Sequence, residues 1–161
     1  MILGRGRILT LVESGLIEDF SIDCLGGAGY DLRLGRIYSL KSDGLLTASA
    51  RQTPKVEEVE ADQHTLRPGD YVLLETLEKI NMPLNLAARI LNRSTVFRCG
   101  CTLINAFVDP GYRGTLTFGL KNLSTRDFTV ERGARIAQIV FEEVAGETEG
   151  YCGRYQGGKV V

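Results

Sequence analysis

Residues 93–122 read RSTVFRCGCTLINAFVDPGYRGTLTFGLKN, and this stretch contains the two patterns that decide the fold. Residues 102–108 and 115–120 are rich in β-branched and apolar side chains, which predicts two strands. Between them, Asp109-Pro110-Gly111 is a turn signature with an acid at its head. We therefore expect a hairpin that presents the Asp109 carboxylate, either as a reactive group or as a cap on its own turn.

The beginning of the same stretch suits a phosphate group. Arg93, Ser94 and Thr95 precede an apolar pair, and Arg98 follows it. Cationic side chains, hydroxyl groups and the free N–H groups of a helix start all bind phosphate oxygens. We therefore predict an anion site here. Arg93, and Arg135 further along the chain, would also suit ion pairs at an interface.

Outward from this stretch, short strands alternate with glycine and proline turns. Further strands are predicted over residues 30–34, 71–76, 86–91, 128–130 and 135–142. One short helix is expected over residues 8–14, ended by Gly15, and residues 41–65 should form a loop excursion with one or two edge strands. This pattern predicts an all-β fold, a barrel or jelly-roll-like sandwich with one or two short helices.

Composition narrows the class of protein. The 161 residues are typical of one domain, and the 19 basic and 20 acidic residues nearly balance, which argues against a nucleic-acid partner. No stretch is long and apolar enough to span a membrane, so we expect a soluble, cytoplasmic protein. The four cysteines are too scattered for a disulfide framework, and with a single histidine, His64, a protein-ligated zinc site is not expected. We expect the cysteines to be small buried apolar residues.

The tail differs in character from the rest of the chain. Residues 1–145 form the predicted barrel domain, whereas residues 146–161 are rich in glycine and contain tyrosines and cations but few aliphatic residues. Such a tail is either a frayed terminus or a mobile arm that closes over a ligand.

Four motifs together resemble those of the dCTP deaminase/dUTPase superfamily. In order, they are AGYDL at 28–32, Arg93-Ser94, DPGYRG at 109–114 and GARIAQ at 133–138. The N-terminal Met-Ile-Leu, the form of residues 93–98 and the tail at 151–156 are similar to the deaminase branch. The chain looks most like the archaeal-type dUTPases of that branch. The resemblance implies a distorted jelly-roll-like barrel that assembles as a homotrimer, with active sites at subunit interfaces.

One position separates the two chemistries of the superfamily. In the deaminases, a Glu ten residues after the Asp of the third motif acts as general acid and base, and in this chain that position is Gly119. Because glycine cannot transfer a proton, the resemblance favours a dUTP diphosphatase that releases dUMP and pyrophosphate. The alternatives are a dCTP deaminase, a bifunctional enzyme that makes dUMP from dCTP, and a non-catalytic nucleotide-binding protein.

The resemblance also assigns roles to residues of this chain. Asp109 would activate water, Tyr112 would lie beneath the deoxyribose, and Mg²⁺ would be held by the substrate phosphates without a protein ligand. Asp31 is expected to serve structure or the trimer contact. The implied substrate-binding residues are Arg93, Ser94, Thr95, Arg98, Ala106, Tyr112, Thr117, Phe118, Gln138, Tyr151, Arg154 and Gln156. Among these, the backbone of Thr117 and Phe118 would pair with the uracil edge.

Overall fold

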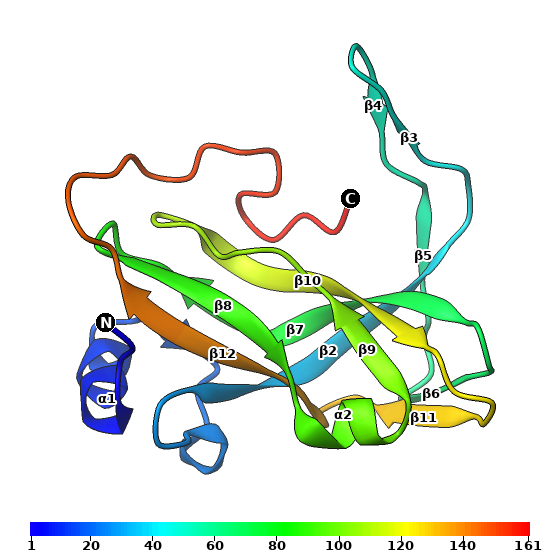
Figure 1. The fold of residues 1–161 in the computed structure, drawn as a ribbon, viewed down its shortest axis with the longest axis horizontal. Helices are drawn as coiled ribbons and strands as arrows, with labels where there is room; N and C mark the ends of the chain where they lie inside the picture. The colour runs from blue at the N-terminus through cyan, green and yellow to red at the C-terminus, as the bar shows by residue number, and fades with distance from the viewer.

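The computed structural model describes all residues from 1 to 161 and consists mainly of β-strands (Figure 1). Its helical segments are α1 (Arg5–Glu13), the 3-10 turn η1 (Ile22–Cys24) and α2 (Ser94–Arg98). Its strands are β1 (Ile17–Glu18), β2 (Tyr30–Leu40), β3 (Leu45–Leu46), β4 (Arg51–Gln52), β5 (Val56–Glu58), β6 (Gln63–Leu66), β7 (Tyr71–Asn81), β8 (Leu86–Asn92), β9 (Cys101–Ile104), β10 (Arg113–Asn122), β11 (Phe128–Glu131) and β12 (Arg135–Glu143).

One eight-stranded sheet curls into a nearly closed barrel. Its main path runs β8–β12–β2–β7–β10–β9, with β1 added to β7 and β5 added to β2. The two ends of this path meet, because the Asn92 side chain accepts a hydrogen bond from the Leu103 N–H at 2.7 Å. Nearby, Val108 forms a bridge with Ala88 of β8. The prediction of a jelly-roll-like β-barrel is therefore confirmed.

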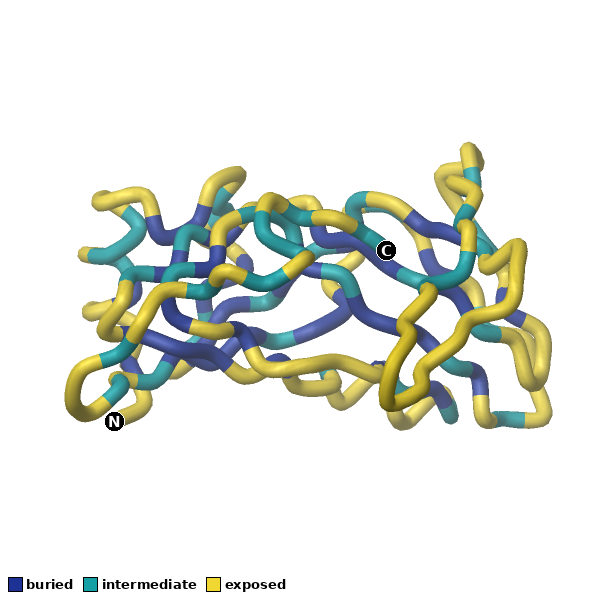
Figure 2. The backbone as a smooth tube through the Cα atoms, turned by 90° about the horizontal axis from the view of Figure 1, so that it is seen from above, coloured by how far each residue is buried: buried dark blue, intermediate teal, exposed yellow.

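Apolar side chains at every second position of the strands fill the interior of the barrel. On β2, Tyr30, Leu32 and Leu34 are fully buried, whereas Asp31 and Arg33 between them are only half-buried. Side chains of a strand point to opposite faces in turn, so the apolar set lies inside. Figure 2 shows the buried residues in the strands of the body and the exposed residues mainly in the loops.

A buried carboxylate joins β2 to β7. Glu78 is fully buried and accepts hydrogen bonds from the Tyr30 hydroxyl at 3.0 Å, the Arg33 N–H at 2.9 Å and the Arg33 guanidinium at 2.7 Å. The Glu78 carboxylate raises the pKa of Arg33, and burial raises the pKa of Tyr30. Both partners therefore remain donors, which is what a buried negative charge requires.

Several elements begin or end at other residues than expected. The first helix begins at Arg5 instead of residue 8, and Gly15 beyond its end has the positive φ, 90°, typical of that position. The excursion over residues 41–65 contains β3, β4, β5 and most of β6, more than the one or two strands expected. β3 and β4 pair only with each other and project from the barrel (Figure 1).

Around Asp109, the predicted pair of strands is present, because β9 and β10 pair antiparallel, but the tight hairpin turn is wrong. The strand expected over residues 102–108 ends at Ile104, and Ile104 lies opposite Gly119, far along β10. Val108 instead exchanges two backbone hydrogen bonds of 2.9 Å with Ala88, so β8 takes the pairing that a hairpin would have used. Asp109 therefore lies on a loop between β9 and β10.

The cysteines divide into two pairs. All four are free, Cys24 and Cys101 are buried as expected, and Cys99 and Cys152 are exposed, which corrects the prediction for the latter two. Cys99 follows the last turn of α2 and Cys152 lies on the tail, and neither position faces the core. None of the helices has the length and apolar character needed to cross a membrane.

Candidate active site

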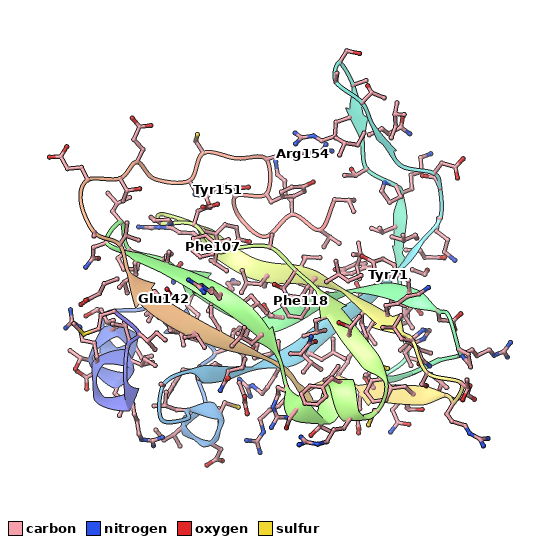
Figure 3. The ribbon with its side chains drawn as sticks, in the orientation of Figure 1. Tyr71, Phe107, Phe118, Glu142, Tyr151 and Arg154 are labelled. Carbon is pink, nitrogen blue, oxygen red and sulfur yellow. The ribbon has the colours of Figure 1, made fainter.

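A pocket of about 390 Å³ lies between the barrel and the C-terminal tail. This volume falls within the range that small-molecule sites occupy. Its walls come from β7, β8, the loop between β9 and β10, β10 itself and the tail. The lining residues used below are Tyr71, Ala106, Phe107, Asp109, Tyr112, Thr117, Phe118, Gly119, Tyr151 and Tyr155. Figure 3 shows Phe107 and Tyr151 toward one side of this region and Tyr71 toward the other.

Asp109 offers an unpaired carboxylate to this pocket. Its backbone carbonyl accepts the Tyr112 N–H at 3.2 Å, and the Gly111 N–H donates to Met82 at 3.1 Å, so main-chain bonds close the turn. Gly111 has a φ of 77°, which an L side chain rarely adopts. The Asp109 side chain is exposed and takes part in no hydrogen bond or ion pair. It therefore does not cap its own turn, and its charge is available to a ligand.

Tyr112 forms the floor of the pocket next to Asp109. It is 8% exposed, and its hydroxyl donates to the Thr115 carbonyl. Its ring meets that of Tyr151 edge to face, with 5.6 Å between centroids. Burial, followed by the neighbouring Tyr151 and Glu75 groups, raises the pKa of Tyr112 to about 12. A neutral aromatic surface of this kind suits the apolar face of a sugar.

The far end of the pocket lies along β10. Thr117 and Gly119 share one face of the strand, since side chains alternate. The Thr117 hydroxyl is buried and has no hydrogen-bond partner in the protein. The ring of Tyr71, from β7, covers Gly119 so closely that a Cβ added there would lie 2.5 Å from Cε2 and 2.6 Å from Cζ. Burial raises the pKa of the Tyr71 phenol, which is therefore neutral.

The predicted phosphate-binding residues gather at a second place. Ser94 and Thr95 begin α2 as exposed residues, and the Arg98 guanidinium lies 5.2 Å from the Phe97 ring centroid. A guanidinium nitrogen of Arg93 lies 3.2 Å from the carboxylate of Asp31, which a second cation, Arg135, approaches at 3.7 Å. Asp31 is thus an ion-pair partner within its own chain.

Gln138 belongs to the same place. It lies opposite Asp31 on one side and Leu91 on the other, in the strand between them. Its side chain packs against Gly29, where a Cβ would lie 3.2 Å from the Gln138 Cγ. Gly29 therefore leaves room for this glutamine beside the α2 residues.

One chain does not bring the two places together. Asp109 follows Val108, which is bridged to Ala88 near the start of β8, whereas Arg93 follows the end of that strand. Arg93 is five positions after Ala88 along the chain, which is about 17 Å at about 3.3 Å per residue. Figure 1 likewise shows α2 at the opposite end of β8 from the tail.

The tail packs over the Asp109 loop of its own chain. The Tyr151 N–H donates to Pro110 at 2.8 Å, and the Gly157 N–H donates to Arg113 at 2.8 Å. The Gln156 side chain accepts from the Arg113 N–H at 2.8 Å and donates to Gly111 at 3.0 Å. The tail is thus tied to the loop at both ends. That it closes over a bound ligand stays a prediction.

The predicted arm residues take different places. Tyr151 lines the pocket, whereas Arg154 points away to donate to Thr53 at 3.3 Å, and Gln156 is engaged with the loop backbone. Sequence reasoning missed Tyr71 and Tyr155 as lining residues. Tyr155 lay within the predicted arm, but nothing in the sequence places Tyr71 beside Gly119, because the two meet only through the pairing of β7 with β10.

Comparison with known proteins decides the family. A family model described as dCTP deaminase-like matches residues 2–144. The chain belongs to this family. A probable deoxyuridine 5′-triphosphate nucleotidohydrolase of Methanothermobacter thermautotrophicus is 36% identical over 141 residues, covering 88% of this chain and 93% of the relative. The dCTP deaminase of Pyrococcus furiosus is 36% identical over 144 residues, covering 88% of this chain and 85% of the relative.

A solved structure agrees on the fold of this dCTP deaminase-like chain. The 2′-deoxycytidine 5′-triphosphate deaminase of Agrobacterium tumefaciens superposes with a TM-score of 0.70 at 20% identity, covering 87% of this chain. The match takes in 47% of that structure, so this chain spans about half of it. The relatives are nucleotide-processing enzymes, and their names divide between two reactions.

Proposed function

We propose that this dCTP deaminase-like chain is a dUTP diphosphatase that hydrolyses dUTP to dUMP and pyrophosphate. The observation that carries the proposal is the contact between Gly119 and Tyr71. The position that the deaminase pattern fills with Glu has no side chain here, and the ring of Tyr71 occupies the space in front of it. Deamination requires a group that takes a proton from water and passes it to the ring and the leaving ammonia. No residue at this end of the pocket supplies one.

Hydrolysis of the triphosphate requires less of the protein. The oxygen of a water molecule forms a bond to the α-phosphorus while the bond from that phosphorus to the bridging oxygen breaks, and pyrophosphate leaves. Asp109 orients this water and accepts its proton. Its exposed, unpaired carboxylate lines the pocket, which supports this role. A general base of this kind typically contributes about 10²–10⁴ in rate.

The rest of the pocket holds the nucleoside. The buried face of Tyr112 packs beneath the deoxyribose and leaves no room for a 2′-hydroxyl. The backbone of Thr117 and Phe118, with Ala106 across the pocket, reads the edge of the uracil. Main-chain donors and acceptors that match uracil leave unpaired groups when cytosine is bound, and such a mismatch discriminates strongly.

Magnesium enters with the triphosphate as part of the substrate. The chain contains no cluster of three His, Cys, Asp or Glu residues that could hold a metal ion, and Asp109 is the one carboxylate lining the pocket. These residues do not fit a resident metal. They are compatible with an ion coordinated mainly by phosphate oxygens, which is how Mg²⁺ is commonly bound with nucleotides.

The cations for the triphosphate come from a second copy of the chain. Arg93 lies about 17 Å along β8 from Ala88, which is bridged beside the Asp109 loop, at about 3.3 Å per residue. Ser94, Thr95 and Arg98 follow it on α2, and Gln138 lies opposite Leu91 on the same part of the sheet. The α2 residues are too far away to share one triphosphate with the Asp109 of their own chain. Assembly into a homotrimer would place these residues against the pocket of a neighbour. Tyr151, Arg154 and Gln156 would complete the site from the tail.

The second candidate is a dCTP deaminase, alone or combined with the diphosphatase. The 36% identity to a dCTP deaminase favours it, whereas Gly119 opposes it. A non-catalytic nucleotide-binding protein is the third candidate, and the free carboxylate of Asp109 argues against it.

Product analysis separates the three candidates. The protein is mixed with dUTP and with dCTP in parallel, each with Mg²⁺, and dUMP, pyrophosphate and ammonia are measured. We expect dUMP and pyrophosphate from dUTP and no change in dCTP. Release of ammonia from dCTP would overturn the argument from Gly119, and binding of dUTP without any product would indicate a non-catalytic protein.

A further inference from the structure

Tyr71 and Gly119 occupy one space across β7 and β10. In the register of these strands, Tyr71 lies opposite Lys121 and Leu73 lies opposite Gly119, so the tyrosine reaches diagonally across the glycine. An added Cβ at Gly119 would lie 2.5 Å from the Tyr71 ring and closer still to its hydroxyl oxygen. The ring therefore fills the volume into which any side chain at position 119 would extend.

The hydroxyl of Tyr71 differs from those of the other tyrosines that pack on the barrel. The other tyrosines inside the barrel use theirs: Tyr30 donates to Glu78 at 3.0 Å, Tyr38 to Glu75 at 2.8 Å, and Tyr112 to Thr115. Tyr71 is instead half-buried and lines the pocket. The Tyr71 hydroxyl makes no hydrogen bond, and neither a hydrogen bond nor a charge contributes to the rise in its pKa.

A second hydroxyl at the same end is also without a partner. The Thr117 hydroxyl is buried and unpaired, and Thr117 precedes Gly119 on the same face of β10. Both Thr117 and Tyr71 line the pocket. Burying an unpaired hydroxyl such as that of Thr117 costs stability, and the half-buried Tyr71 adds a second hydroxyl without a partner in the chain. This end of the pocket is therefore suited to a ligand atom with hydrogen-bonding capacity.

The pocket fixes which part of a nucleotide reaches this end. Asp109 and Tyr112 lie before β10 begins, and the Tyr112 hydroxyl bonds to Thr115. Gly119 is four residues further along, roughly 13 Å at about 3.3 Å per residue. A nucleotide with its phosphate at Asp109 and its sugar at Tyr112 therefore points its base toward Tyr71. In a pyrimidine, N1 carries the sugar and C4 is on the opposite side of the ring. C4 and its exocyclic atom are therefore the part of the base that lies nearest to Tyr71.

We propose that Tyr71 is a specificity-determining residue whose ring edge and hydroxyl meet the exocyclic atom on C4 of the pyrimidine. This inference rests on the proposed function. The Tyr71 ring limits the space available to the substituent on C4. It also occupies the volume that a side chain at position 119 would fill, and so it excludes a proton-transferring group and its water from the vicinity of C4. The residue thus fixes the size of the C4 substituent.

Substrate analogues that are larger at C4 of the base or at C2′ of the sugar test this assignment. The two analogues are 4-thio-dUTP, which has a larger atom on C4, and UTP, which adds a hydroxyl beside Tyr112. The ratio of kcat/KM for dUTP to that for each analogue is measured from pyrophosphate release in wild type, Tyr71→Phe and Tyr71→Ala. A steric fit in a pocket discriminates by about 10–200-fold for one small group.

We expect the preference for dUTP over 4-thio-dUTP to fall in both Tyr71 variants, by about tenfold or more in Tyr71→Ala and by less in Tyr71→Phe. The preference for dUTP over UTP should stay at its wild-type value in both. Tyr71→Phe keeps the ring, so it decides the matter if Tyr71→Ala does not fold. Tyr155→Ala is the matched control, because it removes a tyrosine from the tail side of the pocket and should lower activity without changing the C4 preference.

Two results would overturn the assignment. One is an unchanged preference at C4 in both variants, and the other is an equal fall in both preferences, which would show a general loosening of the pocket. Failure of the proposed function has a different signature, since wild type itself would then release no pyrophosphate from dUTP.

Discussion

The carboxylate of Asp31 on β2 holds the guanidinium of Arg93, 3.2 Å away, at the start of α2. Asp31 also accepts the approach of Arg135 at 3.7 Å, and Arg93 in turn donates to the Arg135 carbonyl at 2.9 Å. The first cation of the predicted phosphate-binding segment is thus fixed to the barrel before any nucleotide arrives. Holding a cation in place lowers the ordering cost of binding an anion.

Asp31→Asn should therefore weaken substrate binding more than it weakens the fold. We expect KM for dUTP to rise severalfold with kcat less affected, and the free energy of unfolding to change by less than about 1 kcal/mol, as for other partly exposed ion pairs. Steady-state kinetics and denaturant unfolding measure the two effects. Glu142→Gln is the control, since it breaks the 2.8 Å pair with Arg89 on the same sheet. An unchanged KM in Asp31→Asn would refute this positioning role.

Asp109→Asn should abolish most of the activity without affecting stability. We expect kcat to fall by about 10²–10⁴, because the amide cannot accept the proton of water. The side chain makes no hydrogen bond that the substitution would break, so the midpoint of denaturation should not move. Asp70→Ala provides the contrast, because Asp70 accepts the Arg67 N–H at 2.7 Å in another turn, and its removal should cost stability while activity is kept. Near-normal turnover by Asp109→Asn would remove Asp109 from the mechanism.

Gly119→Ala should be destabilising although alanine is a small residue. The new methyl group would collide with the Tyr71 ring, and overpacking of this kind costs roughly 1–3 kcal/mol. In the Tyr71→Ala background the cost should largely vanish, giving a coupling free energy of about 0.5–3 kcal/mol in a double-mutant cycle. Gly6→Ala, where nothing lies within 4 Å of the added group, should not be destabilising. Additive effects of the two substitutions would show that the residues do not share the space.

Glu78→Gln should lower the free energy of unfolding far more than Glu57→Gln, which removes an ion pair at the surface. Removing a fully buried charge from its partners Arg33 and Tyr30 leaves the half-buried guanidinium of Arg33 without its counter-charge, at a cost of up to about 3–5 kcal/mol. Glu57→Gln removes an exposed pair with Lys41 at 2.6 Å and should cost less than about 1 kcal/mol. Denaturant unfolding at one pH compares the two, and equal losses would contradict the anchoring role of Glu78.

Alkaline pH should destabilise the protein through Tyr112. Burial raises the pKa of Tyr112 from its ordinary value of 10.0 to about 12 in the folded chain. Between these values the unfolded chain releases the proton and the folded chain retains it, so stability is fully present below pH 10 and falls as pH rises toward 12. Denaturation from pH 8 to pH 11 should show this fall, and Tyr112→Phe should make it shallower. Tyr155→Phe is the control, and an identical slope in Tyr112→Phe would contradict the assignment.

Sequence patterns predicted the elements of the barrel better than their connections. Alternation at Tyr30, Leu32 and Leu34 predicted β2 and its buried face, because burial on one side of a strand leaves a period of two in the sequence. The first strand of the hairpin at Asp109 was predicted to be too long, since Phe107 and Val108 are strand-like, and Val108 pairs with Ala88 of β8 instead of continuing β9. The composition of the residues around Val108 does not indicate that Val108 pairs with Ala88.

The site was predictable in its motifs and not in its geometry. Asp109 was identified from its turn pattern, Tyr112 and Thr117 from the resemblance, and all three line one pocket. Tyr71 was missed because its role depends on meeting Gly119 across the register of two strands. The distance between Arg93 and Asp109 in the fold was likewise not predictable, because the two residues are close in the sequence.

The two exposed cysteines offer a way to follow the site by spectroscopy. Cys99 stands at the end of α2 and Cys152 lies on the tail, while Cys24 and Cys101 are buried and shielded from reagents. A maleimide dye would therefore mark these two places in the native sequence, and a single Cys→Ser replacement would leave one label at a chosen place. Energy transfer between the labels would report how far the tail lies from α2, within one chain or between chains, before and after nucleotide is added.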